Sequence, residues 1–397
     1  MDVQYLNVKI VVCPDSFKES LSSIEAADAI ASGLEIEAGV EPVEVVKIPL
    51  ADGGEGTVEA LVRAVGGEIR WTRVHDPLMR KIDSFFGILD GGKTAVIEAA
   101  AASGLHLLSE SERNPLVTTT YGTGELISEA SRAGVEKIIV GIGGSATNDA
   151  GAGAMTALGV RFLDASGNEL PPGGAALAHL HRIDLSAFDF PLERIKIEVA
   201  CDVTNPLTGP EGASAVFGPQ KGATPEMVEH LDRALAHFAE VIRRDLGQDI
   251  SELPGAGAAG GLGGGLAAFL RAKLRSGIDI VLDAVRFNEA IVDADLVITG
   301  EGRIDEQTAY GKTIGGVLRR TSRLGIPVIA LVGSYSGNIR ALYDAGLTAV
   351  FSIVPGPVSK KHAMEHAAEL LKTTSANIAR FAFAIGTKCA PLKKNTT

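Results

Sequence analysis

The N-terminal part of the chain alternates between short β-branched runs and stretches whose apolar positions have helical spacing. Strands are expected at residues 9–13 and 43–50, and a helix at 58–65 follows the second strand. A capping box of Ser22 and Glu25 predicts the start of an earlier helix. The apolar face of that helix consists of Ala27, Ile30, Ala31 and Leu34. Because parallel strands need crossover helices and bury both faces, this pattern predicts an open α/β sheet with functional loops at the carboxyl ends of its strands.

The same alternation returns toward the end of the chain, whereas the middle is mixed. The late strands are expected at 295–300, 327–333 and 349–354, and the late helices at 315–324, 339–345 and 361–385. The middle strands are expected at 82–89, 94–99, 137–142 and 195–200, and the middle helices at 125–133, 149–158 and 226–246. We therefore expect a discontinuous open α/β domain (residues 1–72 and 282–397) with a mixed α/β domain (73–281) inserted into it. Two consecutive domains would produce a similar pattern.

The composition narrows the class of protein. With 49 acidic and 37 basic residues, the formal net charge is −12, which argues against a general nucleic-acid or anionic-membrane binder. No apolar run approaches the roughly 18 residues that span a bilayer, and the start of the sequence lacks the features of a signal peptide, so a cytoplasmic protein is expected. The three cysteines, Cys13, Cys201 and Cys389, contain no CxxC pair, so neither a disulfide framework nor a structural zinc site is expected.

A glycine-rich junction at residues 138–158 (IIVGIGGSATNDAGAGAMTAL) has the features of a phosphate-binding loop. A buried strand runs into Gly143 and Gly144, and a helix of small residues is expected after them. Ser145, Thr147 and Asn148 are expected to cap that helix. Glycines let backbone amides approach an anion, and a helix start adds partial positive charge. A tight strand-to-helix connection without a ligand is the alternative interpretation.

Charged and polar residues are dense in the segment 298–313 (ITGEGRIDEQTAYGKT), which is expected to be a loop after a strand. They are Glu301, Arg303, Asp305, Gln307 and Lys312. Carboxylates can bind a divalent cation while the basic side chains bind phosphate oxygens. A solvated surface loop is the alternative. A Walker A motif is excluded, because its first glycine would have to stand at position 306, which is Glu306.

A GxGxxG string occurs at Gly255, Gly257 and Gly260, and Asp279 follows about 20 residues later. A dinucleotide-binding fingerprint requires a strand before the glycines. The polar sequence RRDLGQDISELP precedes them instead. A loop that leads into a close-packed helix is therefore expected, with an NAD-dependent oxidoreductase as a rival interpretation.

Aspartates follow three of the predicted strands, where a carboxylate can face a crevice. They are Asp15, Asp52 and Asp202, and the first of them is followed by Ser16 and Lys18. Aspartate is also common as a turn or cap residue, which is the alternative for each of the three.

Two further features concern ligand binding. Lys221 in FGPQKGA (residues 217–223) is another potential phosphate contact. His362 and His366 lie four residues apart, but no third ligand is indicated, so a solvated helix face is expected rather than a metal site.

Several of these segments together resemble the type I glycerate kinase family. In order and spacing, the resemblance is carried by CPDSFKESLSS, PLADGGEGT, TTYGTGELI, GIGGSATNDAGAG, CDVTNPLTGP, FGPQKGA, PGAGAAGGLGGG and DLVITGEGRIDEQTAYGK. It extends from about Lys9 to Ile385. One departure is Glu19, where the family often has glycine. The resemblance implies ATP-dependent phosphorylation of D-glycerate, with 2-phosphoglycerate favoured over 3-phosphoglycerate, Mg²⁺ as the metal, and a Rossmann-like domain split by an inserted domain.

The resemblance and the chemistry of phosphoryl transfer imply roles for the candidate residues. Nucleotide phosphates are expected to bind at Gly143, Gly144, Ser145, Thr147, Asn148 and Lys221. D-Glycerate is expected at Asp15, Ser16, Arg303 and Lys312, the catalytic residues are expected to be Lys18, Asp52 and Asp202, and the metal ligands Glu301 and Asp305. Which aspartate is the base stays open. A cleft that closes between the two domains would exclude water. A metabolite sensor without turnover is a third interpretation.

Overall fold

The computed structural model describes residues 8–38, 43–51, 54, 56–305, 308 and 313–389. The chain divides into two compact units. The split unit consists of Met1–Leu50 with Leu282–Thr397, and the central unit is Ala51–Val281. The first break therefore comes before the boundary expected at residue 72, which lies inside strand β3 (Gly67–His75) of the central unit. Within the described part of the chain, no helix combines the length and apolar character needed to cross a membrane.

The sheet of the split unit has five parallel strands in the order β13-β12-β11-β1-β2. The strands are β1 (Val8–Val12), β2 (Val43–Lys47), β11 (Leu296–Ile304), β12 (Val328–Tyr335) and β13 (Leu347–Ser352). This is the 2-1-3-4-5 order of doubly wound sheets. The second strand in sequence, β2, lies on one side of β1, and the three later strands lie on its other side. The switch point lies between β1 and β11, so a ligand crevice is expected at the carboxyl ends of these two strands.

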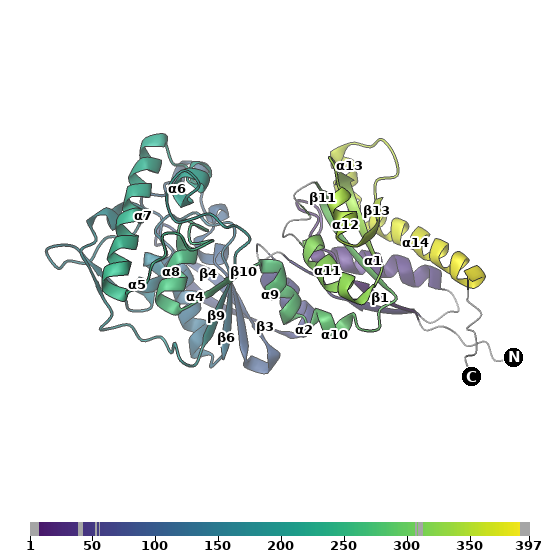
Figure 1. Ribbon diagram of the computed structural model, residues 1–397, viewed down its shortest axis with the longest axis horizontal. Helices are drawn as coiled ribbons and strands as arrows, with labels where there is room; N and C mark the ends of the chain where they lie inside the picture. The colour runs from purple at the N-terminus through teal and green to yellow at the C-terminus, as the bar shows by residue number, and fades with distance from the viewer. Residues whose placement is uncertain are drawn as a thin grey trace. The chain divides into compact units, whose positions relative to one another are not determined.

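The central strands β1, β11 and β12 are largely buried on both faces, as expected for parallel strands, whereas the edge strands β2 and β13 are more exposed. On one face, Ile10 and Val12 of β1 pack with Ile30 and Leu34 of α1 (Ser23–Ala38). Figure 1 shows α1 running beside α14 (Ala367–Cys389), from the opposite end of the chain. The predicted capping box is confirmed, because the Glu25 carboxylate accepts hydrogen bonds from the Ser22 amide (2.9 Å) and hydroxyl (2.8 Å). The remaining helices of this unit are α10 (Phe287–Ala290), α11 (Thr313–Thr321), α12 (Arg340–Asp344) and α13 (Lys360–Glu365).

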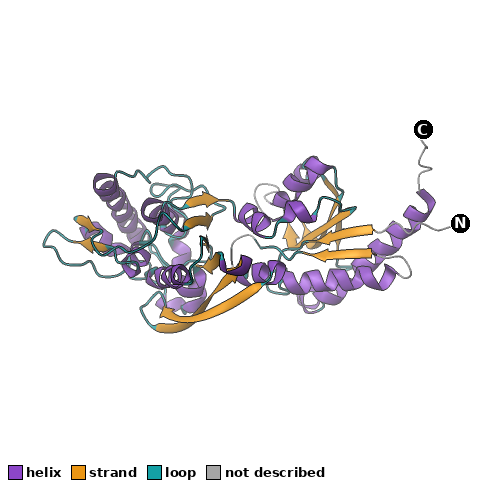
Figure 2. Cartoon of the chain, turned by 90° about the horizontal axis from the view of Figure 1, so that it is seen from below, coloured by secondary structure: helices purple, strands orange, loops and turns teal. Residues whose placement is uncertain are grey.

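The central unit contains a six-stranded mixed sheet in the order β10-β9-β6-β5-β4-β3. Its strands are β3, β4 (Lys81–Leu89), β5 (Thr94–Glu98), β6 (Lys137–Gly141), β9 (Lys196–Ala200) and β10 (Lys273–Arg275). Strands β5, β6, β9 and β10 are parallel, whereas β3 and β4 add an antiparallel hairpin, drawn as long orange ribbons in Figure 2. The predicted strands at 82–89, 94–99, 137–142 and 195–200 are confirmed. Strand β3 was not predicted, because its side chains are mostly exposed and form no apolar run.

The helices of the central unit enclose its core with a small hairpin of β7 (Arg161–Leu163) and β8 (Arg182–Asp184). They are α2 (Thr57–Val65), α3 (Ala100–Ser103), α4 (Tyr121–Arg132), α5 (Ala152–Ala157), α6 (Ala213–Phe217), α7 (Pro225–Leu246) and α8 (Leu262–Leu270). Helix α9 (Gly277–Ala284) leads into the split unit. The four parallel strands end in register, with Glu98 paired to Gly141, Gly141 to Ala200, and Ala200 to Arg275. The loops that follow these strands therefore start side by side.

Candidate active site

The phosphate loop, defined as residues 142–151, connects β6 to α5. Gly143 and Gly144 are exposed, and Gly144 has φ 72°, a conformation that favours glycine. A Cβ atom at Gly143 would lie 3.5 Å from the Cα of Gly54, so Gly54 lies close to the phosphate loop. By contrast, Ser145, Thr147 and Asn148 are at most 5% exposed. Of the five loop residues expected to bind phosphate, only the two glycines lie at the surface.

The expected helix cap after this loop is wrong. Helix α5 starts at Ala152, behind Gly151 at φ 75°, and no side chain caps it. It has only six residues, so a strong helix dipole is not available for anion binding. The exposed backbone of the glycines is what this loop offers to an anion.

Asp149 is the centre of a buried hydrogen-bond network beneath the phosphate loop. One carboxylate oxygen, Oδ2, accepts hydrogen bonds from the Thr120 amide (2.8 Å), the Thr120 hydroxyl (3.0 Å), the Thr119 hydroxyl (3.2 Å) and the Gly153 amide (3.2 Å). The other oxygen accepts from the Gly151 amide at 3.2 Å. Burial raises the pKa of Asp149, although these hydrogen bonds act in the opposite direction. The network joins the TTYGTG segment to the phosphate loop, and sequence reasoning did not single out Asp149.

Lys221 lies beneath the same loop and not at its surface. Its side chain is 1% exposed, and Nζ donates a 2.7 Å hydrogen bond to the backbone carbonyl of Thr147. The structure therefore does not place Lys221 where the sequence analysis expected a phosphate contact. The FGPQKGA segment supports the phosphate loop from the inside.

The buried ammonium predicts a distinctive pH dependence of stability. Burial lowers the pKa of Lys221 to about 7, although the Asp149 charge acts in the opposite direction. An unfolded lysine titrates near 10.4, so between these values the unfolded chain binds more protons and the free energy of unfolding rises with pH, by at most about 1.4 kcal/mol per unit. We expect the melting temperature of the wild type, measured against that of Lys221→Met, to rise from pH 7 to pH 9. Both proteins keep Asp149, so its titration does not distinguish them. A difference in melting temperature between the two proteins that stays constant with pH would contradict the prediction.

The glycines of the segment 255–265 serve close packing against the phosphate loop. A Cβ atom at Gly260 would lie 2.0 Å from the Thr147 carbonyl oxygen, and one at Gly265 would lie 2.1 Å from the carbonyl oxygen of Ala150. The Ala150 amide donates a 3.0 Å hydrogen bond to the Gly260 carbonyl. No strand precedes these glycines, since residues 247–253 are irregular and 254–261 form turns. The dinucleotide fingerprint, and with it the support for an NAD-dependent oxidoreductase, is therefore wrong.

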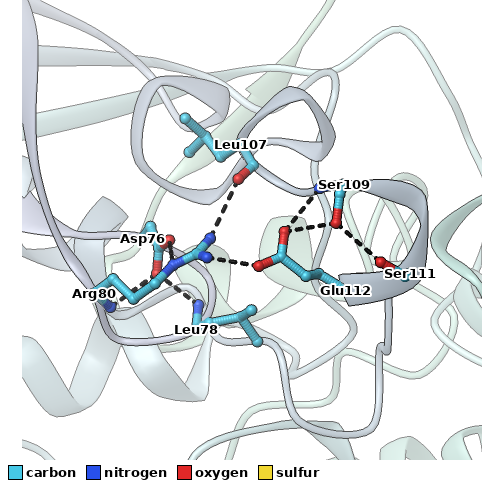
Figure 3. Close-up of polar contacts among 7 residues, drawn as sticks. All are labelled: Asp76, Leu78, Arg80, Leu107, Ser109, Ser111 and Glu112. Atoms are coloured by element: carbon cyan, nitrogen blue, oxygen red, sulfur yellow. Dashed lines mark hydrogen bonds and ion pairs between the residues drawn. The ribbon is translucent and has the colours of Figure 1, made fainter.

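An ion-pair cluster, drawn in Figure 3, holds a segment that contacts the phosphate loop. Buried Asp76, in the turn between β3 and β4, pairs with Arg80, whose guanidinium donates to the Glu112 carboxylate (2.6 Å) and the Leu107 carbonyl (3.3 Å). The segment held in this way begins next to the loop, because the Leu105 amide donates a 2.9 Å hydrogen bond to the Gly144 carbonyl. The carbonyl of exposed Gly144 is thereby fixed from within the central unit.

Asp202 follows β9 in the loop that starts beside the phosphate loop. Its side chain is exposed, and Oδ1 accepts hydrogen bonds from the Gly277 amide (2.9 Å) and the Ser276 hydroxyl (3.0 Å). These contacts hold the carboxylate at the carboxyl edge of the parallel strands. The structure thus brings Asp202 and the phosphate loop to the same edge of the central sheet.

In the split unit, the loop after β1 lies at the switch point of the sheet. Asp15 is 9% exposed and accepts hydrogen bonds from the Ser16 amide (2.6 Å) and from the hydroxyl of Thr313, the first residue of α11. Its own amide donates to the Gly300 carbonyl at 2.8 Å. Lys18, three residues later, is exposed. Asp15 thereby ties the β1 loop to β11 and α11, a link that the sequence did not reveal.

The charged segment 298–313 was predicted to be a loop, but its first part is a strand. Strand β11 continues through Ile304, so Glu301 and Arg303 lie in the strand and Asp305 directly follows it. Alternate residues of a strand point to the same side, which puts Glu301 and Arg303 on one face. The Arg303 guanidinium donates a 3.2 Å hydrogen bond to the Ser336 hydroxyl, beyond the end of β12. Asp52, Gln307 and Lys312 lie outside the described residues.

The carboxylates at the end of β11 fit a metal ion that is also bound by substrate phosphates, and not one held by the protein alone. Among the described residues, no three His, Cys, Asp or Glu side chains gather as a metal site. Magnesium keeps several waters and needs only one or two carboxylates when substrate phosphates supply the other ligands. Glu301 and Asp305 are two such carboxylates.

The histidine pair lies elsewhere in the split unit. In α13 and just after it, the rings of His362 and His366 stack with centroids 4.1 Å apart.

The departure of Glu19 from the family pattern has a backbone consequence. Glu19 has φ 66°, in the left-handed region that favours glycine, and its carboxylate lies 3.4 Å from Lys360 in an exposed pair of little energetic value. We expect Glu19→Gly to leave the melting temperature nearly unchanged or slightly raised, since relief of about 1 kcal/mol of strain offsets the added chain entropy. Glu19→Val is expected to lower it, because β-branched residues tolerate this conformation poorly. Thermal unfolding of both variants checks this; equal melting temperatures would contradict it.

Comparison with known proteins shows similarity over nearly the whole chain. The model of the glycerate kinase family matches residues 10–383. A glycerate kinase of Bacillus subtilis (strain 168) is 55% identical over 94% of this chain and 97% of its own length. The glycerate 2-kinase of Escherichia coli (strain K12) is 49% identical over 94% of this chain and 97% of its own length. A crystal structure assigned as glycerate kinase 2 from Salmonella typhimurium LT2 is 50% identical, covers 96% of this chain and 100% of its own, and has a TM-score of 0.88.

Proposed function

Because the chain belongs to the glycerate kinase family, we propose that it transfers the γ-phosphoryl group of ATP to the 2-hydroxyl of D-glycerate. One observation carries this proposal beyond family membership. The exposed glycines of the phosphate loop and the Asp202 carboxylate start from neighbouring parallel strands whose last residues, Gly141 and Ala200, pair in register. An anion-binding backbone and a potential base therefore lie at one sheet edge, as phosphoryl transfer requires.

In the proposed reaction, the glycerate hydroxyl oxygen forms a bond to the γ-phosphorus as the bond from that phosphorus to the β,γ-bridging oxygen breaks, and ADP leaves. Asp202 accepts the hydroxyl proton. The amides of Gly143 and Gly144 bind the nucleotide phosphates. In the split unit, Lys18 and Arg303 are exposed cations suited to the glycerate carboxylate or the transferred group. The cleft between the two domains stays a prediction.

The proposed metal is magnesium, held by Glu301 and Asp305 together with nucleotide oxygens. When bound, it would neutralise charge on the transferred phosphate. Arg303, placed between these two residues in the chain, would limit the repulsion between the carboxylates and the incoming phosphate. Asp52 stays a proposed catalytic residue and Lys312 a proposed substrate contact.

The function is tested by ADP release in the presence of ATP, Mg²⁺ and D-glycerate, with L-glycerate and no acceptor as controls. Glycerate-dependent ADP is expected, and its absence would remove the proposal. Phosphorus NMR of the product then tests the position. A signal from 2-phosphoglycerate is expected, whereas 3-phosphoglycerate would leave the kinase activity standing and overturn only the choice of hydroxyl.

A further inference from the structure

We propose that Lys221 and Asp149 are positioning residues for the nucleotide, which hold the phosphate loop from beneath so that its exposed glycines keep a geometry that binds phosphate. This inference rests on the proposed function, because it assigns the phosphate loop to ATP. Neither residue is expected to touch the nucleotide. Their effect is on affinity, through the loop.

The first argument is the placement of the two side chains. Each is 1% exposed, and together they hold both ends of the segment 147–153. Lys221 binds the Thr147 carbonyl, and Asp149 binds the amides of Gly151 and Gly153. Thr147 is only three residues after Gly144, so a shift of its carbonyl is transmitted directly to the exposed glycines.

The second argument is that the side chains of this segment leave part of their own hydrogen-bonding capacity unused. Among the described residues, the Thr147 hydroxyl and the Asn148 side-chain carbonyl oxygen are buried without a hydrogen-bond partner. Buried polar atoms normally find partners, and each exception needs an explanation. We attribute these two exceptions to the contacts of Lys221 and Asp149, which hold the backbone on either side of Asn148.

The third argument is the unfavourable burial of a lysine. A fully buried ammonium group is rare, and an apolar side chain of similar size would fill the same space without desolvating a charge. Lys221 is therefore poorly explained by packing alone. The contact that distinguishes it from methionine at this position is the hydrogen bond to the Thr147 carbonyl.

The test compares Lys221→Met with Lys196→Met, a control that removes the same charge from an exposed position in β9. For Lys221→Met, we expect a melting temperature within a few degrees of the wild type and a KM for ATP raised about tenfold, with kcat and the KM for D-glycerate within about threefold. Lys196→Met is expected to leave all three kinetic parameters unchanged. An unchanged KM for ATP in Lys221→Met, or an equal rise in both variants, would overturn the proposal.

Two further measurements make every outcome decisive. Isothermal titration with MgATP in the absence of glycerate should show the same tenfold loss of affinity in Lys221→Met, and this readout remains valid even if the wild type shows no glycerate-dependent turnover. Failure of the kinase assay on the wild type thus counts against the proposed function alone. If Lys221→Met does not fold, Lys221→Gln keeps a shorter donor for the carbonyl, and its ATP affinity should be about three- to tenfold lower than that of the wild type; an unchanged affinity would overturn the proposal. If neither variant folds, Lys221 serves the fold itself and the positioning role is rejected.

Discussion

Replacement of Asp202 by asparagine is expected to lower kcat at least about a hundredfold, because an amide cannot accept the proton of the glycerate hydroxyl and loss of a general base typically has this effect. The exchange preserves the shape of the side chain. Its remaining oxygen can still accept the hydrogen bonds that the Gly277 amide and the Ser276 hydroxyl donate to Oδ1 at 2.9 and 3.0 Å. The melting temperature and the KM for ATP are therefore expected to stay close to those of the wild type. Steady-state kinetics measure kcat and the KM for ATP, and thermal unfolding measures the melting temperature.

A matched control is available at Asp164. Like that of Asp202, its Oδ1 accepts two hydrogen bonds, here from the backbone amides of Ser166 (2.8 Å) and Asn168 (2.9 Å) in the turn after β7. Asp164→Asn makes the same chemical change in the same unit, and full activity is expected. If Asp202→Asn keeps kcat within about threefold of the wild type, Asp202 only holds the start of α9 and the base must be sought elsewhere. Asp52, which follows β2, is then the next candidate.

Gly260→Ala is expected to destabilise the protein by roughly 3–5 kcal/mol, among the largest effects of a single substitution. Gly260 has φ 69°, and its added Cβ would lie 2.0 Å from the Thr147 carbonyl oxygen and 2.6 Å from the Asn148 Cα. Both neighbours are backbone atoms of the phosphate loop, which cannot move without disturbing the contacts of Lys221 and Asp149. In a unit of this size, the melting temperature is expected to fall by roughly 6–20 °C, at about 2–4 °C per kcal/mol.

Gly134→Ala is the control for Gly260→Ala. It distinguishes the steric overlap of the added Cβ with neighbouring atoms from the strain of a left-handed backbone. Gly134 has φ 82°, but nothing lies within 4 Å of its added Cβ. The substitution there is expected to have only the backbone cost of about 1 kcal/mol. Equal melting temperatures of the two variants would show that the segment 255–265 does not press on the phosphate loop. Thermal unfolding of the pair, followed by circular dichroism, makes the comparison.

Much of the architecture could be predicted because it follows from local periodicity. The β-branched runs that became β1, β6 and β9 and the helical stretch that became α7 are long enough to give a clear period. Strand β3 was missed since its exposed side chains give no apolar signal, and the short β10 since three residues give no period.

The candidate site was predicted less completely. The glycine pair at 143–144 was found because glycines after a buried strand are a local signal. The burial of Lys221 and the central position of Asp149 depend on contacts between distant segments. Lys221 and its partner Thr147 are 74 residues apart, and Asp149 and its partner Thr120 are 29 residues apart, so no local pattern reveals these contacts.

By itself, the sequence determined the alternation of strands and helices, the positions of the glycine-rich and charged segments, and the family to which they point. Only the tertiary structure decided which of these residues reach the surface. It placed Lys221 and Asp149 beneath the phosphate loop, left Gly143 and Gly144 exposed, and continued β11 through Glu301 and Arg303. The physical reason is that periodicity reflects interactions within a few residues, whereas burial depends on which distant segments pack together, and that packing sets the role of each polar side chain.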